Sequence, residues 1–197
     1  MGWAQVAPIR QGVVSVDVVK CGYDHPIRLY NEDGKPFATV FRDRSDDEFK
    51  VKNGAGMVSP KLLDKSRAFY AEYGLMILDT DSMTVSGKLV VYVGGEKKLL
   101  DVASVRAFTK YQKWPQFLVG LFIKLQTPGT LYTDTLSTAK PVGKAEAYSY
   151  TVKSVHGDWA YVVCAKTCEE CPAGRIIKGW VRWRKGNTLL VELYYDC

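Results

Sequence analysis

An alternation of apolar and polar side chains runs through most of this chain and constrains its fold more than any other feature. It is plain in residues 14–20 and 86–93, and it recurs through the last third. Successive side chains of a β-strand point to opposite faces, so a period of two residues predicts half-buried strands rather than helices. We therefore expect a mostly β protein.

Turn residues divide this pattern into separate strands. Gly94-Gly95 lies between two alternating runs and predicts a hairpin, because both positions of its turn favour positive φ. Lys185-Gly186-Asn187 predicts a second tight turn near the C-terminus. Besides residues 14–20, the expected strands are residues 75–79, 86–93, 96–102, 104–111, 116–125, 129–133, 145–155, 159–164, 176–184 and 189–194.

One segment carries helix signals. Ser59 is a good N-cap, Pro60 suits the first helical position, and Gly74 suits the residue after a helix. The apolar residues between them are spaced close to one helical face. These features predict an α-helix over residues 60–73.

The length of 197 residues allows one large domain or two small ones. Pro and Gly interrupt the strands near residues 126–129. A Leu-Tyr pair occurs on both sides of this interruption, at Leu29-Tyr30 and at Leu131-Tyr132, and suggests two similar β modules. We expect domains at residues 1–126 and 127–197.

The basic excess gives little support to a nucleic-acid-binding protein. The net charge is +6, but it is spread over both halves of the chain. One basic group near the C-terminus could form an electrostatic footprint, but a charged strand edge is the favoured interpretation because such charges discourage aggregation. This group comprises Arg175, Lys178, Arg182, Arg184 and Lys185.

Four of the five cysteines, Cys164, Cys168, Cys171 and Cys197, lie in the last 34 residues. Two disulfides formed in an oxidising compartment are the favoured interpretation, and four cysteines allow three connectivities. A zinc site with Cys197 as the fourth ligand and a set of free thiols are the alternatives. Cys21 would then be an odd thiol, buried or unpaired.

Residues 129–197 resemble a bacterial Src-homology-3-like (SH3-like) domain. The resemblance rests on G-T-L-Y-T-D at residue 129, on a G-x-W-x-x-V strand at residues 157–162, and on G-W-V at residues 179–181. The chain lacks the R-x-G-P type of motif common in that family's first loop, and it carries a cysteine-bearing insertion at residues 164–174. The resemblance implies an SH3-like β-barrel over residues 129–197, and the repeated Leu-Tyr pair suggests a second, divergent SH3-like barrel that is elaborated by the helix.

Aromatic residues supply both a core and a candidate ligand groove in such a small barrel. Trp159 and Trp180 are expected to form a cross-strand pair in the core. Alternation along the strands is expected to place other aromatic side chains away from the core, where aromatic-lined grooves dock extended peptides. The expected groove residues are Tyr132, Tyr148, Tyr150 and Trp183.

No catalytic constellation stands out. Cys21 and His25 are only four residues apart, no helix follows Cys21, and His156 is remote in sequence, which is unlike a Cys-His peptidase. The acidic run at residues 46–48 lacks the spaced oxygen ligands of a calcium loop and predicts a solvated turn. We expect no catalytic residue, no metal and no cofactor.

These observations favour a non-catalytic binding module of a bacterial envelope or exported protein. Its expected ligand is a peptide or a cell-wall fragment. A protein-binding inhibitor or immunity-type protein is the alternative, and a nucleic-acid-binding β-barrel is less favoured. A periplasmic or extracellular location is expected from the cysteines, although the first residues show no secretory leader pattern. No apolar stretch approaches the roughly 18 residues of a membrane span.

Overall fold

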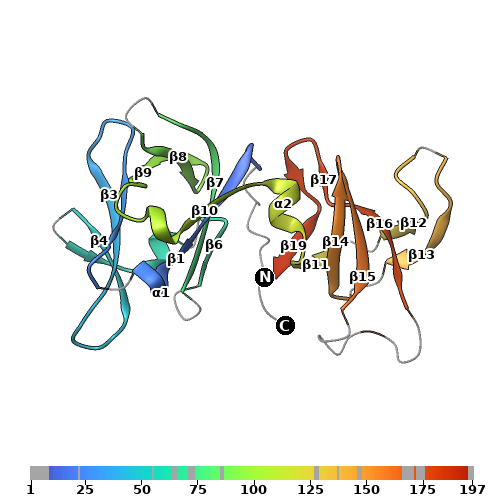
Figure 1. Cartoon of the computed structure of the whole chain (residues 1–197), viewed down its shortest axis with the longest axis horizontal. Coiled ribbons are helices and arrows are strands. Elements are labelled where there is room, and N and C mark those ends of the chain that lie inside the picture. Colours follow the sequence, from blue (N-terminus) through green and yellow to red (C-terminus); the bar gives the residue numbers. More distant parts are fainter. Residues whose placement is uncertain are drawn as a thin grey trace. The chain divides into compact units, whose positions relative to one another are not determined.

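The computed structural model divides into two compact units, one from Ile9 to Gln112 and one containing the described residues from Lys113 onward (Figure 1). We call them the N-terminal unit and the C-terminal unit. Strands account for 55% of the structure and helices for 9%, which confirms a mostly β fold. The structure describes residues 9–21, 23–54, 56–63, 66–70, 74–84, 87–126, 129–136, 138–145, 148–165, 171 and 176–194.

The N-terminal unit is built on one antiparallel sheet with strand order β10-β1-β7-β8-β9-β2-β3-β4-β5, in which β6 also pairs with β7. Short helices connect some of these strands. The elements are β1 (Gly12–Asp17), α1 (Val18–Cys21), β2 (Ile27–Tyr30), β3 (Pro36–Arg42), β4 (Phe49–Asn53), β5 (Gly56–Val58), η1 (Pro60–Leu63), β6 (Ala68–Tyr70), β7 (Leu75–Met83), β8 (Leu89–Val93), β9 (Glu96–Leu100), η2 (Arg106–Phe108) and β10 (Thr109–Lys113).

The hairpin between β8 and β9 is the one predicted from Gly94-Gly95. Val93 pairs with Glu96, and the two glycines have φ angles of 63° and 82°. Both angles lie in the left-handed region that glycine enters without a steric penalty. Alternate residues of β8 then reach the core of the unit, which also receives Val14, Val16 and Leu78 from the central strands.

The helix expected over residues 60–73 is wrong. Residues 60–63 form a single 3-10 turn, and β6 follows as a strand, with Ala68 opposite Ile77 and Phe69 opposite Met76; residues 64–65 and 71–73 lie outside the described part. Leu63 and Phe69 both contact the apolar core from this turn and strand. Pairing with β7 therefore overrides the local helix signals.

The C-terminal unit is built on a seven-stranded sheet with order β13-β12-β16-β15-β14-β11-β19, beside a two-stranded β17-β18 hairpin (Figure 1). The turn of this hairpin, Gly186-Asn187, is the one predicted near the C-terminus. The elements are α2 (Trp114–Leu118), β11 (Phe122–Leu125), β12 (Gly129–Tyr132), β13 (Pro141–Ala145), β14 (Tyr150–His156), β15 (Trp159–Cys164), β16 (Lys178–Arg182), β17 (Arg184–Lys185), β18 (Thr188–Leu189) and β19 (Val191–Tyr194).

The boundary between the units lies between Gln112 and Lys113, so the boundary expected after residue 126 is too late in the chain. The single strand expected over residues 116–125 is also wrong. Pro115 lies in the first turn of α2, where its missing N–H breaks no hydrogen bond. Gly120 then turns the chain with a φ of 92°, and β11 pairs with β14 and β19. Both elements belong to the C-terminal unit.

A tryptophan pair forms the centre of the core of the C-terminal unit. Trp114 and Trp183 are 1% and 0% exposed, and their rings stack with centroids 6.0 Å apart. Trp183 Nε1 donates a hydrogen bond to the carbonyl oxygen of Gly157 over 3.0 Å. This bond satisfies the polar atom of an otherwise apolar side chain, so the indole is stable in a fully buried position.

A buried ion pair lies in the sheet of the N-terminal unit. Arg67 donates hydrogen bonds from Nε and Nη2 to Oδ2 of Asp79 over 3.1 and 2.6 Å, and both side chains are at least 94% buried. Burial raises the pKa of Asp79, although the Arg67 charge acts in the opposite direction. The Arg67 charge therefore offsets part of the cost of burying this carboxylate.

Removal of the buried Trp183 ring should destabilise the C-terminal unit more than removal of a partly exposed aromatic ring. We expect Trp183→Ala to lower the free energy of unfolding by about 3–5 kcal/mol, because a large buried side chain leaves a cavity. Trp180→Ala, on the same stretch of chain, is the matched control. Urea unfolding followed by tryptophan fluorescence measures both, and equal losses would show that Trp183 is not a core residue.

The Arg67–Asp79 pair should be more sensitive to the loss of one partner than to the loss of both. We expect Arg67→Met to cost about 3–5 kcal/mol at pH 7, and Arg67→Met with Asp79→Leu to recover most of this loss. The single variant should regain stability as the pH falls from 7 to 5, because its folded state binds a proton at Asp79 more tightly than the unfolded chain does. Urea unfolding followed by circular dichroism at both pH values tests this; a deficit that grows in acid would contradict it.

Candidate functional site: an aromatic sheet face

The central strands of the C-terminal unit sort their side chains cleanly between two faces of the sheet. On β16, Gly179 and Val181 are buried, whereas Lys178 and Arg182 are exposed and Trp180 is partly exposed. On β15 the buried residues alternate in the same way with the partly exposed Trp159, Tyr161 and Val163. One face of the sheet thus forms the core, and the other presents aromatic and basic side chains outward.

Four aromatic residues gather on the outward face as two ring pairs. Tyr161 lies opposite Trp180 in the β15–β16 register, and the ring centroids are 5.4 Å apart. Tyr132, from β12, meets Trp159 edge to face at 5.5 Å. All four rings keep part of their surface exposed. We call Tyr132, Trp159, Tyr161 and Trp180 the aromatic face.

A shallow pocket of about 220 Å³ adjoins the aromatic face. Tyr132 and Trp159 line it, and Leu125 and Leu190 add aliphatic surface. Arg182 also lines the pocket, with its guanidinium carbon 4.9 Å from the centre of the Trp159 ring. Such a pocket can receive one apolar side chain beside a fixed positive charge.

The spacing of the aromatic face depends on a glycine in β16. A Cβ atom on Gly179 would lie 3.0 Å from Cβ of Leu131 and 3.1 Å from the carbonyl oxygen of Tyr132. Contacts this short require the neighbouring atoms to shift by a few tenths of an ångström. Gly179 therefore lets β12 approach β16 closely enough for Tyr132 to join the rings contributed by β15 and β16.

Three of the four residues expected in the groove, Tyr148, Tyr150 and Trp183, are not part of the aromatic face. Tyr150 and Trp183 are both 0% exposed, so the expectation that they face a groove is wrong. Tyr148 is partly exposed and packs against Tyr150, with ring centroids 6.4 Å apart. Tyr132 lies on the aromatic face.

The two tryptophans expected in the core, Trp159 and Trp180, belong to the aromatic face instead. They are not cross-strand partners either, because Trp159 lies opposite Arg182. The sequence contains the signal that identifies the outward side: Trp180 shares its parity with Lys178 and Arg182, whose charges need water. Trp183 shares its parity with Gly179 and Val181.

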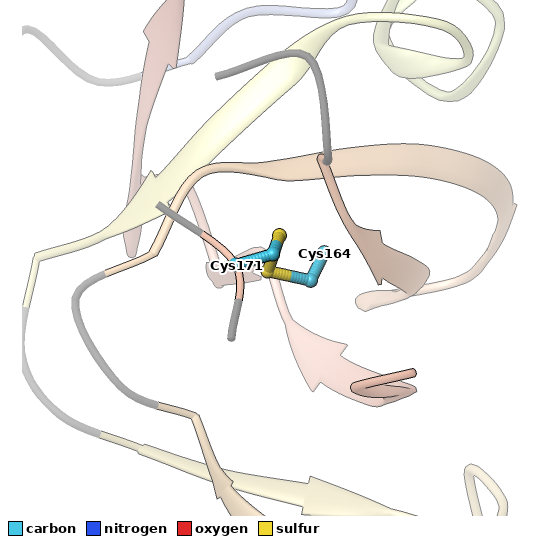
Figure 2. The surroundings of a disulfide bond; sticks show 2 residues. All are labelled: Cys164 and Cys171. Atoms are coloured by element: carbon cyan, nitrogen blue, oxygen red, sulfur yellow. A yellow bond between two sulfur atoms is a disulfide. The ribbon is translucent and has the colours of Figure 1, made fainter. Parts of the chain in front are cut away.

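A disulfide joins Cys164, at the end of β15, to Cys171 (Figure 2). A sulfur held in a disulfide is not a thiolate, so this arrangement excludes the zinc site that would use these two cysteines. Cys168 and Cys197, the other disulfide candidates, lie outside the described residues, and their pairing remains a prediction.

Cys21 is a buried free thiol in the N-terminal unit. Burial, with a smaller contribution from the charge of Asp17, raises its pKa to about 11, which makes it a poor nucleophile at neutral pH. His25, the histidine nearest to Cys21 in the sequence, packs against Phe108, with ring centroids 5.7 Å apart.

The acidic run at residues 46–48 is held by basic side chains. Asp46 pairs with Lys50 over 2.5 Å, and Asp47 pairs with Arg42 over 2.5 Å. The residues form a turn between β3 and β4, in keeping with the predicted solvated turn. Across the described residues, no group of three or more His, Cys, Asp or Glu side chains is arranged to hold a metal ion.

No helix in the described part of the chain is long and apolar enough to cross a membrane. Comparison of the chain with protein-family models, curated proteins and solved structures gave no match.

The Cys21 thiol should resist alkylation in the folded protein. With a pKa of about 11, roughly a thousandth of the thiol is ionised at pH 8, and the side chain is buried as well. We expect iodoacetamide to label Cys21 at least 100-fold more slowly in the native protein than in urea, as measured by peptide mass spectrometry. Labelling at equal rates would show that Cys21 is accessible and activated.

Proposed function

We propose that the protein is a non-catalytic binding protein that holds an extended peptide or a cell-wall fragment against the aromatic face. The observation that carries this proposal is the placement of four partly exposed rings in two contacting pairs on one side of a sheet. Aromatic residues concentrate binding energy because they bury a large area while losing little conformational freedom.

The pocket beside Trp159 supports a ligand with protruding groups. Its volume of about 220 Å³ suits one side chain or a small ring rather than a whole metabolite, since small-molecule sites are usually larger. An extended ligand lying across the rings could place one substituent in this pocket. The resemblance of residues 129–197 to SH3-like domains points to the same class of ligand.

The Cys164–Cys171 disulfide supports a location outside the reducing cytosol, because disulfides persist mainly in oxidising compartments. We propose that the protein is exported and acts at the bacterial envelope. The alternative is an immunity-type or inhibitory protein that binds a folded partner through the same face. Whether the ligand is an extended chain or a folded protein therefore distinguishes this alternative from the proposed function.

Replacement of Trp159 or Tyr161 by alanine should weaken ligand binding at least tenfold, which corresponds to about 1.4 kcal/mol. The probes are purified peptidoglycan, assayed by cosedimentation, and an array of random ten-residue peptides. Tyr111→Ala is the control, because Tyr111 is 51% exposed and lies in the N-terminal unit.

Thermal unfolding of each variant shows whether a loss of binding reflects a loss of folding. If neither peptidoglycan nor any peptide binds the wild-type protein, the proposed function is wrong. Binding that survives replacement of both rings would place the ligand site elsewhere.

A further inference from the structure

The outward side of the C-terminal sheet is basic as well as aromatic. Strands β12, β14, β15 and β16 contain no aspartate or glutamate. Two cations with exposed side chains, Lys178 and Arg182, share the side of Trp180 on β16. A ligand lying on the aromatic face would meet positive charge with no acidic side chain from these strands to offset it.

Arg182 is held in position without being neutralised. Its guanidinium lies over the Trp159 ring at 4.9 Å, an arrangement that orients the group through cation–π attraction. Within the described part of the chain, neither Arg182 nor Lys178 forms a salt bridge. The planar guanidinium keeps N–H donors suited to a carboxylate.

Arg184 of the same unit, in contrast, has both an acidic partner and an aromatic ring beside its guanidinium. Its Nε donates to Oδ1 of Asp158 over 2.6 Å, and its guanidinium lies 4.8 Å from the ring of the buried Trp183. Arg182 has the equivalent ring contact with Trp159 but no described acidic partner. The guanidinium of Arg182 is therefore available to an anionic group outside the chain.

From these observations we propose that the aromatic face selects peptides that carry carboxylates, with one carboxylate at Arg182 and a neighbouring apolar side chain in the pocket between Trp159 and Leu190. This inference rests on the proposed function and specifies its ligand class. The peptide can be free or part of a cell-wall fragment, because both present amide and carboxylate groups.

A single-stranded nucleic acid is a less suitable ligand for the same face. Aromatic rings and cations also bind such strands, but those sites follow the phosphates with a continuous basic groove. Here Arg182 and Lys178 lie on one strand, and the net charge of +6 is spread over the whole chain. The pocket wall supplied by Leu125 and Leu190 also favours an aliphatic group.

The test compares ligands that differ only in their carboxylates. Each acidic peptide that binds on the array is paired with a version in which every carboxylate is replaced by its amide, and peptidoglycan is used before and after amidation of its carboxyl groups. We expect the carboxylate form to bind about tenfold more tightly at 50 mM salt and only about twofold more tightly at 500 mM, because salt screens exposed charges.

Arg182→Gln should reduce this preference about fivefold while retaining binding of the amide form. Lys185→Gln is the matched control, because it removes the same charge from an exposed position in β17, outside the seven-stranded sheet. Unchanged thermal unfolding of both variants shows that the fold is retained.

The outcomes separate the two proposals. Equal binding of the carboxylate and amide forms would overturn carboxylate selection and leave the proposed function standing. No binding of any peptide or of peptidoglycan would overturn both. Tighter binding of a ten-nucleotide oligothymidine than of the best acidic peptide would also overturn carboxylate selection, in favour of a nucleic-acid ligand.

Discussion

The stack of Trp183 on Trp114 determines how the C-terminal unit is arranged. It joins the start of the unit, at α2, to the segment that follows β16. Because side chains alternate along the chain, burying Trp183 also sets the side on which Val181 and Trp180 lie. The core pair thereby places Trp180 and Arg182 on the outward side, where the candidate site forms.

The aromatic face is thus a product of the core behind it. Two rings from β15, one from β16 and one from β12 reach the same side because each strand buries its alternate residues. Rings on a sheet are held by paired backbone and have few rotatable bonds, so little conformational freedom remains for a ligand to remove. The site is pre-organised by strand pairing.

Much of the fold follows from local chemistry and was predictable. The period of two residues gives β15 its full length, and Gly94-Gly95 marks a hairpin because its two φ angles suit no other residue as well. Prediction from local sequence signals failed where pairing with another strand determines the conformation. Residues 60–73 carry helix signals, yet Ala68 and Phe69 pair with β7.

Of the four members of the candidate site, the sequence predicted Tyr132 alone. Aromatic residues on a small β unit indicated a ligand groove, but the choice between the two sides of β16 requires the parity of its charged residues. Lys178 and Arg182 mark that side in the sequence. The ring that Tyr132 meets follows only from the strand order, because β12 pairs with β16 from a distant part of the chain.

Gly179 has a consequence for how chains of this kind can diverge. A side chain there would crowd Leu131 and the backbone of Tyr132, so a substitution requires β12 to shift together with Tyr132. Leu125 and Leu190 contribute aliphatic surface to the pocket. Substitutions at these leucines would change what the pocket accepts, whereas position 179 favours the smallest residue.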